Sequence, residues 1–222
     1  DFDPKYKGGY RSWWGFETLP EVNEETPSFV EFITGEGGVI DTWLRRGAAG
    51  FRLDVADELP DAFIEKIRTA VKRVSPEKFL LGEVWEDATT KFGFDHRRTY
   101  LLGKGLDSVM NYPFKNSVLD FVKGKPAQQA ANEILSICEH YPAPAINTAL
   151  NFLSTHDTER ALTVIADEPA NGRGREWQSG RSVTGEAYEE GMLRLRMAYA
   201  IIYTLPGVPC LYYGDEIGMQ GY

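Results

Sequence analysis

Hydrophobic residues along the chain form short apolar runs separated by longer amphipathic stretches. Residues 50–55 and 79–84 are compact runs with the length of a buried strand, and residues 106–111 form a weaker third run. Residues 149–154 and 208–213 are two more runs of the same kind. The pattern therefore predicts five short strands.

The segments around these runs have apolar residues at helical spacing. Helices are predicted over residues 38–46, 60–74, 114–122, 127–141 and 192–205. Residues 1–38 lack a sustained period and are expected to be loop or extended chain, and a polar loop is expected at about residues 167–185. Strands that alternate with helices indicate parallel βα units, which exclude an all-β or all-α fold.

The remaining choice is between an open sheet and a barrel. No glycine-rich phosphate fingerprint follows any of the predicted strands, so the usual support for a dinucleotide-binding open sheet is absent. Polar residues gather instead where strands end. In parallel βα barrels, catalytic groups are supplied by the carboxyl ends of several strands.

Composition and charge narrow the class of protein. The 222 residues are 42% hydrophobic and 13% aromatic, enough for a sizeable core. A net charge of −9 argues against nucleic acid as a partner, and the longest apolar stretch, residues 197–203, is far below the roughly 20 residues that span a bilayer. Cys138 and Cys210 form neither a disulfide framework nor a zinc motif and are expected to be small buried side chains. We therefore expect no nucleic-acid or membrane partner.

The first predicted strand contains two charged residues. Strand alternation places Arg52 and Asp54 on one face and Phe51, Leu53 and Val55 on the other. Buried charges are costly unless they pair or take part in chemistry, and a neighbouring cation keeps an aspartate ionised. An ion pair that only links the strand to a helix is the structural alternative.

Two more acidic residues follow later strands. Glu83 ends the second strand, where a helix cap or a surface partner is the alternative, and His156 and Asp157 follow the fourth. Because carboxyl ends of barrel strands converge, Asp54, Glu83 and Asp157 are expected to share one pocket. Two nearby carboxyl groups with different protonation states are what cleavage of a glycosidic bond requires.

Three segments resemble a known family in their order and content. Gly-Phe-Arg-Leu-Asp-Val-Ala-Asp-Glu at residues 50–58, Leu-Gly-Glu-Val-Trp at 81–85 and Phe-Leu-Ser-Thr-His-Asp at 152–157 resemble the signature segments of the α-amylase family, glycoside hydrolase family 13. Trp-Trp-Gly at residues 13–15 and Tyr-Tyr-Gly-Asp-Glu-Ile-Gly at 212–218 are also similar to that family. The resemblance covers nearly the whole chain.

The resemblance implies a (β/α)8 barrel and a retaining mechanism. Asp54 would be the nucleophile, Arg52 would orient it, and Glu83 would be the general acid and then the base. Asp157 and His156 would bind sugar hydroxyls. In a retaining enzyme the two reacting carboxyl groups are expected about 5 to 5.5 Å apart.

The segment after the nucleophile is most similar to neopullulanases, cyclomaltodextrinases and maltogenic amylases. Asp57 stands where those enzymes usually have Asn, and Glu86 where many have His. The resemblance implies hydrolysis of α-1,4-linked glucose oligomers, cyclodextrins or pullulan, with an α-glucan oligosaccharide as partner. Trp85 is expected either to stack on a sugar or to pack, and Glu58 and Trp85 to influence whether water or a sugar resolves the intermediate. An α-glucan transglycosylase and a non-catalytic carbohydrate-binding relative are the alternatives.

The order of the segments predicts a partial barrel. The five strands would correspond to strands 4 to 8, strands 1 to 3 would lie before Asp1, and residues 1–38 would be the tail of the inserted domain. Residues 1–222 would then be the C-terminal part of the barrel, with an open sheet edge that favours homo-oligomers. The cleft would lack one wall, so the isolated piece is expected to be impaired or inactive. No cofactor and no metal ligands are identified here, and calcium would belong to the missing part. Low cysteine content favours a cytoplasmic location over secretion.

Overall fold

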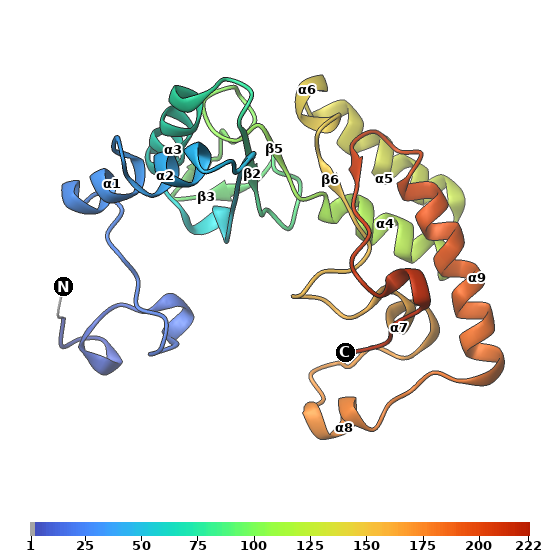
Figure 1. Ribbon diagram of the computed structural model, residues 1–222. Coiled ribbons are helices and arrows are strands. Elements are labelled where there is room, and N and C mark those ends of the chain that lie inside the picture. The colour runs from blue at the N-terminus through green and yellow to red at the C-terminus, as the bar shows by residue number, and fades with distance from the viewer. Residues whose placement is uncertain (1–2) are drawn as a thin grey trace. The chain divides into compact units, whose positions relative to one another are not determined.

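The computed structural model describes residues 3–222, which fall into two compact units. The first unit holds the described residues up to Ala49 together with Ala62–Lys78, and the second holds Gly50–Asp61 and Phe79–Tyr222. The helices are α1 Pro27–Thr34, α2 Val39–Arg45, α3 Asp61–Val74, α4 Tyr112–Val122, α5 Ala127–His140, α6 Ala143–Ile146, α7 Ala161–Ala166, α8 Arg175–Ser179 and α9 Gly185–Ile202 (Figure 1). The strands are β1 Gly50–Leu53, β2 Phe79–Gly82, β3 Phe92–Gly93, β4 His96–Arg97, β5 Ser108–Val109, β6 Leu150–Asn151 and β7 Val208–Pro209, and the 3-10 helices are η1 Lys7–Gly9, η2 Trp13–Gly15, η3 Ala56–Glu58 and η4 Asp215–Ile217.

The first unit is formed by α1, α2 and most of α3. Helix α1 lies within the first 38 residues, so the expectation of loop or extended chain there is wrong in part. Pro27 begins this helix, and the ring of Phe29 packs 5.8 Å from the ring of Phe63 on α3. The guanidinium of Arg73 also donates to the carbonyl of Thr34 at 2.9 Å. Contacts with residues distant in the sequence therefore stabilise a helix too short to stand out in the pattern.

The second unit contains a three-stranded parallel sheet in the order β1-β2-β5. Its register pairs Gly50 with Phe79 and Leu53 with Gly82, and Gly82 in turn with Val109. A Cβ atom at Gly82 would lie 2.2 Å from a methyl carbon of Leu106, so any larger residue at this point of β2 would require the Leu106 side chain to move. The register between β1 and β2 places the carboxyl ends of the two strands side by side.

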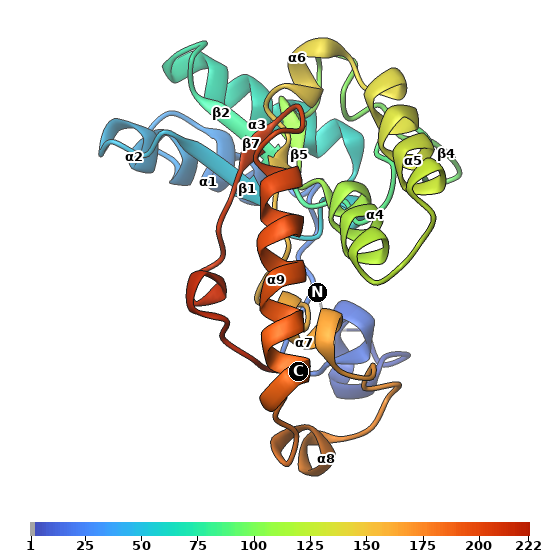
Figure 2. The same ribbon diagram turned by 90° about the vertical axis from the view of Figure 1, so that its right-hand side faces the viewer.

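A second pair of parallel strands, β6 and β7, continues this arrangement. Figure 2 labels β7 just beyond the upper end of α9. The parallel bridge between Met110 and Leu150 joins the chain just beyond β5 to β6. All five predicted strands are present and follow one another in chain order, although each is shorter than its apolar run. The antiparallel hairpin of β3 and β4 was not predicted.

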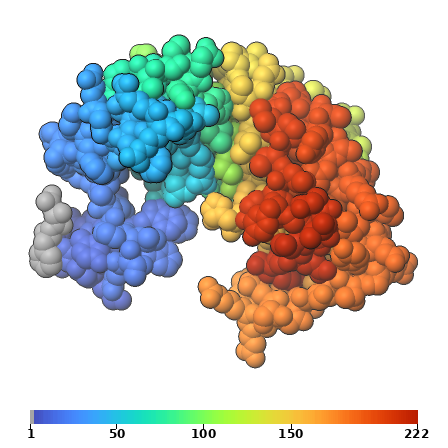
Figure 3. Space-filling model, in the orientation of Figure 1, coloured from blue at the N-terminus to red at the C-terminus, as the bar shows by residue number. Residues whose placement is uncertain are grey.

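Helices α4, α5, α7 and α9 pack together in the second unit. The predicted helices 114–122 and 127–141 correspond to α4 and α5, and α9 begins earlier than its apolar stretch. Their buried core contains Val118, Leu119, Val122, Leu153, Ala161, Leu162, Ile165, Leu195, Ala198 and Ile202. The other side of α9 carries exposed residues such as Leu193 and forms part of the surface of this unit (Figure 3, orange to red).

The polar loop expected before α9 is more ordered than predicted. It contains α8, in which the indole of Trp177 lies between two guanidinium groups, with Arg173 3.7 Å and Arg181 4.9 Å from the ring centroid. Arg181 also pairs with Asp167. These arginines are therefore engaged within the loop rather than simply solvated.

Two further expectations concern membranes and cysteines. Among residues 3–222, no helix has both the length and the apolar character needed to cross a bilayer. Cys138 and Cys210 are free thiols, and both are half-buried rather than fully buried.

Candidate active site

The first charged strand end places a guanidinium between two carboxylates. Arg52 lies on β1, and its Nη1 donates to Oδ1 of Asp54, the residue directly after the strand. Arg52 Nη2 lies 3.0 Å from Oε1 of Glu83, an ion pair outside hydrogen-bond geometry. The amide of Glu83 donates to the carbonyl of Leu53 at 3.0 Å, so sheet pairing itself aligns the two strand ends. Asp54 and Glu83 thus contact the two terminal nitrogens of one guanidinium group.

The two carboxylates have different surroundings. The side chain of Asp54 is 72% exposed, whereas that of Glu83 is 6% exposed. Oε2 of Glu83 accepts from the amide of Val55 at 2.9 Å. Oε1 accepts from Trp85 Nε1 at 3.2 Å and from the hydroxyl of Tyr112 at 3.4 Å. Glu83 is therefore held by donors contributed by three segments, while Asp54 remains open to solvent.

Val55 has an unusual backbone conformation. Its φ of 46° and ψ of 47° lie in the left-handed region, which is rare for a β-branched residue. The expected alternation through residue 55 is therefore wrong, because β1 ends at Leu53 and the chain turns at once into η3. The turn directs the amide of Val55 toward Glu83.

Tyr112 connects the acidic groups of the site. Burial raises the pKa of Tyr112 to about 12, and the negative charges of Glu83 and Asp157 act in the same direction, against a hydrogen bond with Thr155 and the positive charge of Arg52. The carboxylate of Asp157 therefore lies within electrostatic reach of the hydroxyl that contacts Glu83. The phenol stays neutral at physiological pH and can donate.

Aromatic packing fixes one wall of the site. The indole of Trp85 stacks on the ring of Tyr112, with centroids 4.3 Å apart, and Tyr112 meets Phe152 edge to face at 4.9 Å. Trp85 is nevertheless 44% exposed. The indole of Trp85 therefore packs against Tyr112, and part of the indole remains accessible to a ligand.

The third acidic residue lies beyond β6. Nε2 of His156 is 3.1 Å from Oδ2 of Asp157, and both side chains are exposed. The hydroxyl of Thr155 accepts from the amide of Asp157 at 3.2 Å, which fixes the turn. Glu58 ends η3 and is also exposed.

Sequence patterns predicted some of these groups and not others. Arg52, Asp54, Glu83 and Trp85 are in one connected set of contacts. Tyr112 was missed, although it comes two residues after the bridge at Met110 and so occupies the carboxyl end of the third predicted strand. Position after a strand was therefore an available signal.

Metal ligands are not gathered in the described part of the chain. Within residues 3–222, no group of three or more His, Cys, Asp or Glu side chains is arranged to hold a metal ion.

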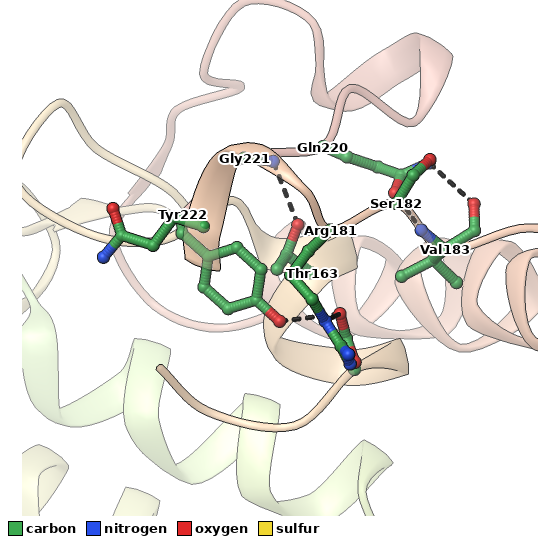
Figure 4. Close-up of a pocket in the computed structure, with 9 residues that line it drawn as sticks. Thr163, Arg181, Ser182, Val183, Gln220, Gly221 and Tyr222 are labelled. Atoms are coloured by element: carbon green, nitrogen blue, oxygen red, sulfur yellow. Dashed lines mark hydrogen bonds and ion pairs between the residues drawn. The ribbon is translucent and has the colours of Figure 1, made fainter. Parts of the chain in front are cut away.

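A separate pocket, which contains none of these site residues, lies beside α7 (Figure 4). The hydroxyl of Tyr222 donates to Asp167 at 2.6 Å, and the amide of Gly221 donates to the hydroxyl of Thr163 at 3.0 Å. These polar groups form hydrogen bonds with one another. The hydrogen bonds attach α7 and the loop after it to the last residues of the chain.

Comparisons with known proteins identify the family of this chain. Residues 7–222 match the family model of the α-amylase catalytic domain. The chain is 33% identical to an amylopullulanase of Thermoanaerobacter thermohydrosulfuricus over 99% of its own length and 16% of the relative's. It is 32% identical to a cyclomaltodextrinase of Bacillus sp over 94% of its own length and 32% of the relative's.

A solved structure has the same fold. Ligand-free cyclic α-maltosyl-(1→6)-maltose hydrolase from Arthrobacter globiformis superposes with a TM-score of 0.76 and 29% identity, over 96% of this chain and 41% of that one. The chain thus spans less than half of each of these three proteins. It belongs to the α-amylase family of glycoside hydrolases, whose catalytic domain is a (β/α)8 barrel.

Proposed function

We propose that this chain supplies the catalytic residues of a retaining hydrolase that cleaves α-1,4-glucosidic bonds in starch-derived oligosaccharides, cyclodextrins or pullulan. The observation that carries the proposal is the guanidinium of Arg52 between exposed Asp54 and buried Glu83. A retaining glycosidase needs two carboxyl groups in one site, one as nucleophile and one as acid and base. The names of the relatives, amylopullulanase and cyclomaltodextrinase, support an α-glucan substrate.

Asp54 is suited to the nucleophilic role. Its carboxylate contacts the guanidinium of Arg52, and exposure leaves a carboxylate oxygen free to approach a sugar. In the first step this oxygen forms a bond to the anomeric carbon while the bond to the leaving oxygen breaks. The proton of Glu83 passes to that leaving oxygen.

Glu83 is suited to work as acid and then as base. After giving up its proton it is a carboxylate, and the surrounding groups of Val55, Trp85 and Tyr112 all donate to it. These donors can therefore stabilise the carboxylate that forms in the first step, which takes a proton from water in the second step. That water attacks the anomeric carbon and releases Asp54, so that the configuration is retained.

Sugar binding is assigned to the remaining predicted residues. Asp157 and His156 present exposed polar groups beyond β6, and the negative charge of Asp157 acts on Tyr112. We assign them to hydroxyl groups of the sugar that reacts. We also assign the five strands to strands 4 to 8 of the barrel, with residues 1–38 as the tail of the inserted domain.

The test is proton NMR of maltohexaose incubated with the full-length protein that contains these residues. Retention predicts that α-anomers appear first. Glu83→Gln, which cannot supply the proton, is expected to lower turnover by about 10²–10⁴-fold.

Glu77→Gln is the matched control, because Glu77 is an exposed glutamate in the first unit. It is expected to keep normal turnover. β-Anomers as the first products would refute the retaining mechanism, and full activity in Glu83→Gln would refute the role of Glu83.

A further inference from the structure

One ammonium group joins the two segments that follow the catalytic carboxylates. Nζ of Lys91 lies 2.9 Å from Oδ2 of Asp57 and also pairs with Oε2 of Glu86. Asp57 comes three residues after Asp54, and Glu86 comes three residues after Glu83. The segments that follow Asp54 and Glu83 are therefore connected to each other through Lys91.

This cluster is more than a loose surface pair. The side chains of Lys91 and Asp57 are 23% and 19% exposed, and the second oxygen of Asp57 accepts from the hydroxyl of Tyr100 at 3.1 Å. Burial lowers the pKa of Lys91, but its contacts with Glu86 and Asp57 outweigh this and the net pKa is raised. Lys91 is thus charged throughout the physiological range, and both pairs persist there.

A neighbouring arginine holds the same segment without involving Glu86. The buried guanidinium of Arg98 donates to Asp61 Oδ1 at 2.8 Å and to the carbonyls of Asp57 at 2.7 Å and Leu59 at 2.6 Å. It also lies 4.5 Å over the ring of Tyr100. Arg98 therefore anchors the segment after Asp54 to the chain that follows β4. Lys91 links this anchored segment to the segment after Glu83.

Each connected segment carries an exposed side chain next to a residue that pairs with Lys91. Glu58 follows Asp57, and Trp85 precedes Glu86. Because Nε1 of Trp85 donates to Glu83, the indole lies next to the group that protonates the leaving oxygen. A sugar on the leaving side of the bond must therefore pass this indole.

We propose that Lys91 is a positioning residue for the leaving-group side of the cleft. By joining Asp57 to Glu86 it holds Glu58 and Trp85 at a fixed separation, which gives the departing or accepting sugar a preformed surface. The inference rests on the proposed hydrolase function.

The test compares two substrates in the full-length protein. Maltohexaose places sugars on the leaving side, whereas α-maltosyl fluoride has only fluoride there. Lys91→Met is expected to lower kcat/KM for maltohexaose, and the ratio of transfer to hydrolysis products, by about three- to tenfold. Turnover of α-maltosyl fluoride is expected to stay within twofold of the unmodified protein.

Matched variants separate positioning from folding. Lys104→Met removes an exposed lysine from the same stretch of chain between β2 and β5. It is expected to change the turnover of neither substrate. Glu86→Gln removes the same link at an exposed position and is expected to reproduce Lys91→Met, with the double variant no worse than either single one.

Equal losses on both substrates, or no loss on maltohexaose, would overturn the role of Lys91. If the unmodified protein turned over neither substrate, the proposed hydrolase function would itself be wrong.

Discussion

Val55 has a strained backbone conformation that allows its amide to donate to Glu83. A left-handed conformation costs an L-residue about 1–2 kcal/mol, and a β-branched side chain makes it rarer still. The same conformation brings the amide of Val55 to Glu83. Strain of this kind persists where the surrounding structure enforces it, which is common at active sites.

Replacing Val55 by glycine should separate strain from function. Val55→Gly relieves the steric cost and keeps the amide, so after the entropic cost of glycine we expect the free energy of unfolding to rise by about 0.5–1 kcal/mol. Urea denaturation measures this change. Val22→Gly is the control, because Val22 is exposed and lies outside the left-handed region, and it is expected to lower stability. A clear loss of stability in Val55→Gly would show that the valine conformation is not strained.

At the scale of elements, two buried asparagines join strands that share few backbone hydrogen bonds. Nδ2 of Asn111 donates to Oδ1 of Asn151 at 3.0 Å, and Nδ2 of Asn151 donates to the carbonyl of Pro206 at 2.8 Å. Asn111 also caps α4 by accepting from the amide of Phe114. Side-chain amides thus supplement the two-residue strands β6 and β7.

Removing this link should weaken the second unit. Asn151→Ala leaves Asn111 and the Pro206 carbonyl without their partner, and we expect a loss of about 2–4 kcal/mol in the free energy of unfolding. Asn132→Ala, at an exposed position on α5, is expected to change it by less than about 0.5 kcal/mol. Thermal and urea unfolding of both variants measure the difference. Equal effects would show that the buried pair carries no special weight.

Sequence patterns predicted the presence and order of the strands and helices better than the residues at which these elements begin and end. Apolar runs located all five strands because buried parallel strands are continuously hydrophobic. The runs overestimated strand length, since Asp54 and Glu83 lie beyond their strands in the turns that follow. Helix α1 and the contact of Tyr112 with Glu83 depend on residues far apart in the chain, and local periodicity carries no signal for them.

At the scale of the whole molecule, the order β1-β2-β5 followed by β6-β7 leaves two outer strands. Within the described residues, β1 and β7 each pair on one side only. Unpaired strand edges are templates for association, which closed barrels avoid.

The 222-residue chain produced by itself is therefore expected to associate. Light scattering after size-exclusion chromatography should give a mass above 25.0 kDa that rises with concentration. Val208→Lys places a charge on the β7 edge at an exposed position and is expected to reduce the association. A stable monomer over the whole concentration range would contradict this expectation.

The contacts of Glu83 have a consequence for synthesis on the ribosome. Every group that holds its carboxylate lies between residues 52 and 112, whereas Asp157 is added 45 residues after Tyr112. At about 5–20 residues per second, all of these partners of Glu83, the proposed general acid, are translated roughly 2–9 s before Asp157 is made. The residues proposed for catalysis are thus translated in two stages, and the contacts of Glu83 can form before the later stage is complete.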